Sequence, residues 1–255
     1  MSQHLGTLQA PPKVPGHPRV AWASVRECPP KTDTHGGGLG SRGMDGIRLT
    51  GALTVWKAPH PAWRSNPEWP EEVGFATWES TDVYVFIDPL VRDDLDAAAW
   101  ERFDLAVAES DRPAAVLLTA PWHERSVRAV AARYDAHVWI HPRGRARVAD
   151  LPELEALPEG VEVFVPDGVD EGQVAFHIVP EQALVVAEFF LGTNSGLQVL
   201  PSPGTQDRAA FAASLDQLRN LSIERVLVAH GPAVLQRGED AIRAALDAFA
   251  TRDAG

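Results

Sequence analysis

The chain has 255 residues, of which 45% are apolar and 23% charged, a composition typical of folded globular proteins and unlike that of disordered chains. It has no stretch of about 18 apolar residues, so we expect no membrane-spanning helix and no membrane partner. Cys28 is the single cysteine, which excludes a disulfide framework or a cysteine-based zinc site within one chain. The first residues lack the features of a secretory signal, and we therefore expect a cytoplasmic protein.

The charge is distributed unevenly along the sequence. Residues 1–43 carry five basic and two acidic side chains, whereas the rest of the chain carries 18 basic and 33 acidic ones. A body this acidic repels phosphate backbones, so we expect no nucleic-acid partner. Residues 1–43 also contain Pro-Pro and Gly-Gly-Gly runs without a periodic apolar pattern, which predicts a disordered, flexible tail. One folded domain is then expected over residues 44–255.

The predicted elements begin at Met44. Apolar runs and alternating patterns predict strands, in chain order, at 47–56, 74–78, 83–87, 116–119, 137–140, 161–165, 173–179, 184–187 and 226–229. Helical spacing of apolar residues predicts helices near 94–108, 124–134, 206–219 and 239–250. Strands that come first as a block and then alternate with helices favour an α/β fold, with two sheets packed face to face and helices outside.

Polar side chains gather where four of the predicted strands end. Asp88 follows the strand at 83–87, and residues 119–126 join the next strand to a helix. Glu188 and His230 follow the strands at 184–187 and 226–229. Because binding and catalytic groups of α/β folds collect at the carboxyl ends of strands, these segments are the candidate site.

In this succession the chain resembles the metallo-β-lactamase superfamily over about residues 47–250. Leu117-Leu118-Thr119 matches the family's lead-in to a His-x-His-x-Asp-His metal motif, and residues 168–173 match the spacing of its middle Gly-His-Thr-x-Gly-Ser segment. Ala187-Glu188 falls where the family has Gly-Asp, and residues 228–231 match its last strand, which ends in histidine. The resemblance implies a four-layer αββα sandwich and a hydrolase-type site.

The resemblance also implies where metal ligands would stand, and this sequence departs from that pattern. The three histidine positions of the first metal site are Ala120, Trp122 and Val169, which cannot bind a metal. At the second site Glu124, Glu188 and His230 keep ligand chemistry, but a histidine is replaced by Arg125, a permanent cation without a lone pair to donate. We therefore expect no metal cofactor, and the alternative is one Mn, Fe or Zn ion held by Glu124, Glu188 and His230.

A more specific hypothesis concerns Arg125. We expect its planar guanidinium to take the place of the metal and to bridge Glu124 and Glu188, with His230 nearby. The candidate catalytic residues are therefore Glu124, Arg125, Glu188 and His230. His60, Trp63, Trp122 and His123 are candidates for ligand binding, with His123 expected to hydrogen-bond outward, and the alternative for the tryptophans is packing of a loop against the sheet. Residues 192–196 are expected to form a flexible loop at the rim.

Three functions remain open from the sequence alone. The first is a pseudoenzyme of the hydrolase fold that binds a small molecule or a protein partner after losing most metal ligands. The alternative is a mononuclear metal-dependent hydrolase of esters or thioesters using Glu124, Glu188 and His230. A structural protein that oligomerises without a ligand is a third reading. Arg125 argues against metal and hence for the pseudoenzyme.

Overall fold

The computed structural model describes residues 44–60, 70–91, 97–169, 172–201 and 205–253. All of them belong to one compact unit. The predicted tail, residues 1–43, and the candidate ligand residue Trp63 lie outside the described residues. No described helix is long and apolar enough to cross a bilayer.

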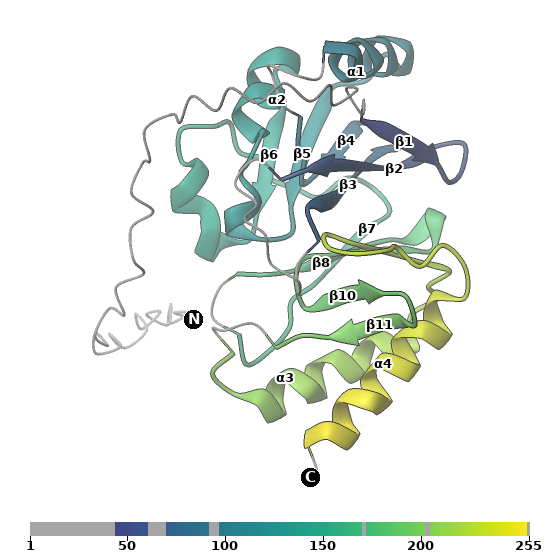
Figure 1. Cartoon of the computed structure of the whole chain (residues 1–255). Coiled ribbons are helices and arrows are strands. Elements are labelled where there is room, and N and C mark those ends of the chain that lie inside the picture. Colours follow the sequence, from purple (N-terminus) through teal and green to yellow (C-terminus); the bar gives the residue numbers. More distant parts are fainter. Residues whose placement is uncertain (1–43, 61–69, 92–96, 170–171, 202–204, 254–255) are drawn as a thin grey trace, which may run out of the picture. The chain divides into compact units, whose positions relative to one another are not determined.

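The first sheet has six strands in sequence order (Figure 1). They are β1 (Asp45–Arg48), β2 (Leu53–Pro59), β3 (Glu72–Glu79), β4 (Tyr84–Ile87), β5 (Ala114–Leu118) and β6 (His137–Ile140). Strands β1 to β4 pair in antiparallel fashion, and β4, β5 and β6 pair in parallel. The carboxyl ends of β4 and β5 therefore open onto the same edge of this sheet.

The second sheet has four strands in the order β12-β9-β8-β7. They are β7 (Val161–Phe164), β8 (Ala175–Ile178), β9 (Ala183–Val186) and β12 (Arg225–Val228). β9 and β12 are parallel, so Glu188 and His230, each two residues beyond its strand, leave the sheet at the same end. A separate hairpin is formed by β10 (Phe190–Thr193) and β11 (Gly196–Val199).

The α-helices of the described residues cover the outer faces of the sheets (Figure 1). They are α1 (Ala97–Ser110), α2 (Val127–Tyr134), α3 (Arg208–Leu215) and α4 (Gly238–Asp253). Short 3₁₀ helices lie at η1 (Pro121–His123), η2 (Pro142–Val148), η3 (Val179–Glu181) and η4 (Asp216–Asn220). Helices α1 and α2 pack on the first sheet, and α3 and α4 pack on the second.

The two sheets and the helices outside them form four layers. An apolar core lies between each pair of neighbouring layers. In β4, Tyr84 and Phe86 face α1 and α2, whereas Val85 and Ile87 face the second sheet. Strand β9 alternates in the same way. The apolar runs of β4 and β9 are thus strands buried on both faces. Continuous apolar runs are the pattern expected of such doubly covered strands. The predicted αββα sandwich is confirmed.

Two expectations about local structure are wrong. Residues 47–56 form two strands rather than one, because Thr50 Oγ1 accepts hydrogen bonds from the backbone N–H groups of Ala52 and Leu53 and closes a turn. Residues 192–196 belong to the β10–β11 hairpin rather than to a flexible rim loop. The Thr193 hydroxyl donates to the carbonyl of Gly196 and stabilises that turn.

Gly192 fixes the position of the segment that carries His230. Its N–H donates to the carbonyl of His230 at 3.0 Å, and a Cβ at this position would lie 2.0 Å from the backbone oxygen of Pro232. We expect Gly192→Ala to lower the free energy of unfolding by about 2–3 kcal/mol, because backbone rather than a flexible side chain must move. Urea denaturation measures this, and Gly51→Ala is the control because nothing lies within 4 Å of its Cβ position. Equal losses in the two variants would contradict the packing argument.

The two sheets meet closely at the end where their strands carry the polar residues. Gly74 of β3 donates its N–H to the carbonyl of Ala229 at 2.7 Å, and a Cβ on Gly74 would lie 2.5 Å from the carbonyl oxygen of Val228. Val73 also forms an isolated bridge with His230. This approach places His230, which follows β12 of the second sheet, beside residues that follow β4 and β5 of the first.

Candidate functional site

Asp88 lies buried at the bottom of the site. It follows β4 with φ of +54°, a left-handed conformation that aspartate tolerates better than most side chains. One carboxylate oxygen accepts the backbone N–H of Thr119 at 2.8 Å, and the other accepts the Thr119 hydroxyl. Asp88 thereby ties the end of β4 to the end of β5.

His123 lies between two carboxylates. Its ring is fully buried, with Nδ1 2.9 Å from Asp88 Oδ2 and Nε2 3.7 Å from Glu188 Oε1. Burial lowers the pKa of this imidazole, and so does the Arg125 cation, but the charges and hydrogen bonds of Asp88 and Glu188 outweigh both and raise the pKa above its ordinary value. His123 therefore lies between the carboxylates of the two sheets.

Glu188 contacts three other polar side chains of the site. Its Oε1 lies 3.6 Å from His230 Nε2 as well as 3.7 Å from His123 Nε2, and the indole N–H of Trp122 donates to its carboxylate. Burial alone would raise the pKa of Glu188, but the contacts with His123, His230 and Trp122 together hold it well below its ordinary value. Glu188 is an anion at neutral pH.

Arg125 adds a cation to the same cluster. The residue as a whole is half-buried, but its Nη1 has no exposed surface and no hydrogen-bond partner among the described residues. Burial lowers the pKa of Arg125, while the negative charges of Asp88 and Glu188 raise it, so both carboxylates lie within electrostatic range of the guanidinium. An arginine remains charged in this setting.

His60 and Trp122 border the cluster and are both half-buried. Burial lowers the pKa of His60, and the positive charges of Arg125, His230 and His123 lower it further. A neutral imidazole and an indole therefore adjoin the charged groups. Both residues are ligand-binding candidates from the sequence, and the structure brings both to the site.

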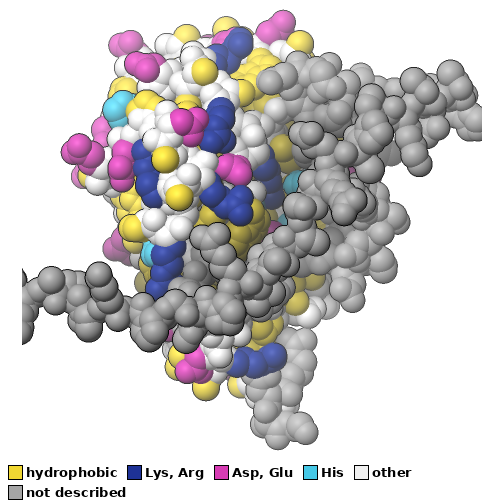
Figure 2. All heavy atoms as spheres, turned by 90° about the vertical axis from the view of Figure 1, so that its left-hand side faces the viewer, with side chains coloured by type: hydrophobic (Ala, Val, Ile, Leu, Met, Phe, Trp, Pro, Cys, Tyr) yellow, Lys and Arg dark blue, Asp and Glu magenta, His cyan; other side chains and the backbone are white. Residues whose placement is uncertain are grey.

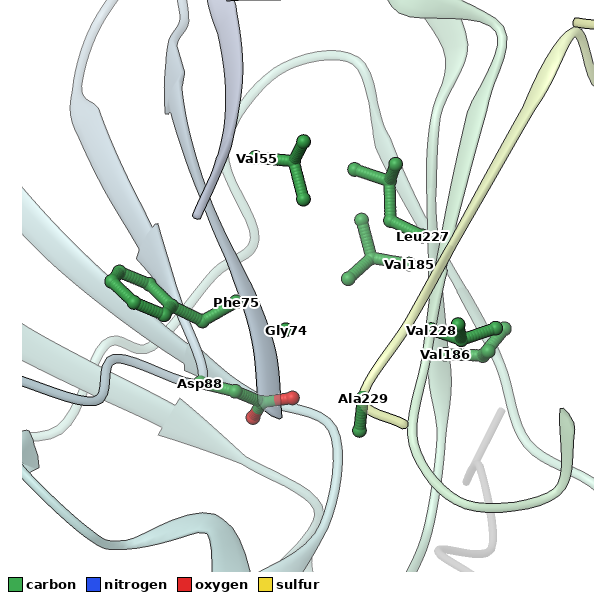
Figure 3. A pocket seen from close by; sticks show the side chains of 9 residues that line it. All are labelled: Val55, Gly74, Phe75, Asp88, Val185, Val186, Leu227, Val228 and Ala229. Carbon is green, nitrogen blue, oxygen red and sulfur yellow. The ribbon is translucent and has the colours of Figure 1, made fainter. Parts of the chain in front are cut away.

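A small pocket lies behind the cluster, between the two sheets. Figure 3 shows Val55 of the first sheet facing Val185 and Leu227 of the second, with Asp88 at one end. Apart from Asp88 its lining consists of apolar residues and Gly74. The polar cluster is thus supported by dry apolar surface, where charge–charge interactions are stronger than in water.

Comparisons with solved structures agree on the fold. The chain is similar to a metallo-β-lactamase from Erythrobacter litoralis (15% identity, 82% of this chain and 96% of that chain covered, TM-score 0.59). It is also similar to one from Pontibacter korlensis (12% identity, 80% and 99%, TM-score 0.58) and to a metallo-β-lactamase family protein from Thermus thermophilus (17% identity, 81% and 82%, TM-score 0.54). No family profile and no curated protein matches the sequence.

The chain has the metallo-β-lactamase fold. Structural matches extend over most of the chain, and their order of strands and helices accounts for the resemblance seen in the sequence. Identities this low establish the fold and leave the activity open.

The side chains at the positions where the sequence resemblance implies metal ligands do not suit a metal ion. Ala120 and Val169 are buried and offer no side-chain donor, and Trp122 donates its N–H to Glu188. Arg125 contributes a buried positive charge where a ligand would stand. Among the described residues, no group of three or more His, Cys, Asp or Glu side chains is placed to hold a metal.

The expected bridge from Arg125 to Glu124 is wrong. Glu124 accepts hydrogen bonds from Arg128 and Arg147 at the surface instead. On the face in Figure 2, Lys and Arg side chains likewise lie beside Asp and Glu side chains. The ligand set Glu124, Glu188 and His230 is therefore not brought together, although Glu188 and His230 are neighbours.

The expected outward orientation of His123 is also wrong. Its ring has no exposed surface, because it packs beneath the site against Asp88 and Thr119. The sequence indicates His123 only as a candidate for ligand binding, and Thr119 only as part of a lead-in motif. The signal that could have identified them is a hydroxyl and an imidazole four residues apart, directly after a buried strand and beside a strand that ends in aspartate.

Proposed function

We propose that this protein is a metal-independent pseudoenzyme of the metallo-β-lactamase fold. We propose that it binds a small molecule at the cluster of Asp88, His123, Arg125 and Glu188, called the Arg125 cluster. The observation that carries the proposal is the buried positive charge of Arg125 within electrostatic range of both Asp88 and Glu188. A divalent ion beside this guanidinium would experience electrostatic repulsion.

The arrangement of charges supports this proposal. Asp88 and Glu188 bring two carboxylates to the cluster, and Arg125 and His123 bring basic groups beside them. Fixed side chains would thus take over the electrostatic role that metals have in this fold.

The alternative, a mononuclear metal-dependent hydrolase, receives less support. Glu188 and His230 are adjacent and could supply two ligands, but Glu124 is engaged with Arg128 and Arg147 at the surface. A third ligand would have to be Nε2 of His123, and the Arg125 cation lies within electrostatic range of that ring.

Metal analysis of Arg125→His is the direct test. We expect wild-type protein purified without chelators to contain far less than one equivalent of zinc, iron or manganese, and we expect Arg125→His to take up more, because a neutral imidazole replaces the cation beside Glu188 and His230. Elemental analysis measures both. Arg147→His is the control, since Arg147 contacts Glu124 at the surface.

About one equivalent of metal in the wild type would contradict the proposal. A panel of ester, thioester and phosphodiester substrates adds a second criterion. Turnover that a chelator abolishes would establish the metal-dependent hydrolase instead, whereas the pseudoenzyme predicts no turnover above background.

A further inference from the structure

The outer edges of the two larger sheets differ in how they are covered. Beside β12, Val226 and Val234 exchange backbone hydrogen bonds of 2.8 and 2.9 Å, so the chain itself closes that edge. Beside β6, Val138 donates its N–H to the carbonyl of Pro152 and accepts from Leu154. Strand β7 is the last strand of the second sheet, and no other described strand pairs with its outer side. Within the described part of the chain, β7 is therefore an open edge.

The backbone of β7 shows which of its residues face the open side. β7 and β8 are antiparallel, and Val179 donates its N–H at 2.9 Å to the carbonyl of Gly160, one residue before β7 begins. Backbone groups of an antiparallel strand point alternately to its two sides, so Glu162, two residues further, directs its groups to β8. Val163 and Val165 therefore direct their N–H and C=O groups away from β8, toward the open edge.

The same two valines have exposed side chains. Val163 is 37% exposed and Val165 is 42% exposed. Val163 lies opposite Phe176 of β8, whose ring packs on Trp139 of β6, the last strand of the first sheet. Phe176 is fully buried there, whereas Val163, one strand further out, is only partly covered. An open strand edge with apolar, β-branched side chains is a surface to which another strand can add.

We infer that β7 of a second copy of this chain pairs with this edge in antiparallel orientation and joins the two second sheets. Val163 of one copy lies opposite Val163 of the other, and the two residues exchange both backbone hydrogen bonds. The N–H of Val161 already donates to the carbonyl of Pro158, so the Val161 carbonyl accepts from Val165 of the second copy. Because each copy has one such edge, the pairing closes as a dimer with two-fold symmetry.

The sequence of β7 suits pairing with itself, which favours a second copy as the occupant. With Val163 on the two-fold axis, Val161 of each copy lies opposite Val165 of the other, so every residue that faces the edge meets a β-branched partner. Glu162, the charged residue of the strand, lies opposite Phe164 rather than opposite the second Glu162. Two copies with a formal net charge of −12 each can thus meet here without opposing carboxylates across the strands.

Sedimentation velocity of the full chain tests the dimer. We expect the wild type to reach about twice the chain mass of 27.6 kDa as concentration rises. Val163→Lys should raise the dissociation constant at least tenfold, because it places two like charges opposite each other on the edge. Ile47→Lys is the matched control, since Ile47 is 56% exposed on β1, the outer strand of the first sheet, and should dimerise like the wild type. Circular dichroism checks that both variants are folded.

Cysteine cross-linking tests the register and does not depend on a charged variant. Cys28 is the single cysteine, so the background is Cys28→Ala. In it, Val163→Cys places two thiols on residues whose Cα atoms are about 5.5 Å apart in the dimer, a separation that a disulfide spans. The two copies of Val165→Cys would be about 14 Å apart, at about 3.4 Å per residue along the strand. After mild oxidation, gel electrophoresis without reductant should show a linked dimer for the first variant and monomer for the second.

Three results would overturn the dimer or its register. A wild type that stays monomeric at the highest concentration reached would contradict a second copy and leave β7 to a strand of a different protein. A dimer that Ile47→Lys dissociates and Val163→Lys leaves intact would place the interface on β1. Equal cross-linking of Val163→Cys and Val165→Cys would contradict the antiparallel register. No residue of β7 belongs to the Arg125 cluster, so these results are independent of the metal analysis.

Discussion

Asp88→Ala is expected to lower the free energy of unfolding by about 3–5 kcal/mol. The side chain is 3% exposed and accepts hydrogen bonds from Thr119 and His123, so alanine would leave those buried donors unsatisfied. It would also remove the negative charge that favours protonated His123. Urea denaturation at neutral pH measures the loss.

Two variants separate these contacts from backbone effects. Asp111 is exposed and has φ of +53°, nearly that of Asp88, so Asp111→Ala carries the cost of a left-handed alanine alone, about 1 kcal/mol. Asp88→Asn keeps an acceptor oxygen for the N–H of Thr119 but not the charge, and should lose less than Asp88→Ala. If Asp88→Ala and Asp111→Ala lost the same stability, the side-chain contacts of Asp88 would not stabilise the protein.

The sequence allowed the layers of the fold to be predicted because the strongest patterns come from doubly buried strands. Residues 83–87 and 184–187 are continuous apolar runs, since alternate side chains enter two different cores. The β10–β11 hairpin gave no comparable signal. Its four-residue strands contain two glycines, and the role of Gly192 depends on a contact with Pro232, forty residues away in sequence.

The sequence indicates where the candidate site lies but not which of its side chains contact one another. Asp88, Glu188 and His230 were found because they follow parallel strands, whose carboxyl ends meet. The orientations of residues 122–125 could not be predicted, since they depend on the 3₁₀ turn at Pro121–His123. Trp122, within this turn, donates to Glu188, while Glu124, which follows the turn, accepts hydrogen bonds from Arg128 and Arg147.

The cluster therefore depends on one carboxylate from each sheet, and the second gives the other large expected effect. We expect Glu188→Gln to lower the free energy of unfolding by about 3 kcal/mol at pH 7, because Arg125 and His123 would then share a single counter-charge, Asp88. The side chain is 26% exposed, which allows some solvent screening and places the value at the low end for a buried pair. The exposed Glu155→Gln is the control and should change stability by less than about 0.5 kcal/mol.

The pH dependence identifies charge as the cause. The pKa of Glu188 is held well below its ordinary value of 4.5, so its stabilising contribution is present above that pH and is lost as pH falls toward the pKa in the folded state. The stability difference between wild type and Glu188→Gln should thus shrink by about 1.4 kcal/mol per pH unit below pH 4.5. Denaturation series from pH 7 to pH 3 measure this, and a difference that does not change with pH would mean that Glu188 acts through packing rather than through its charge.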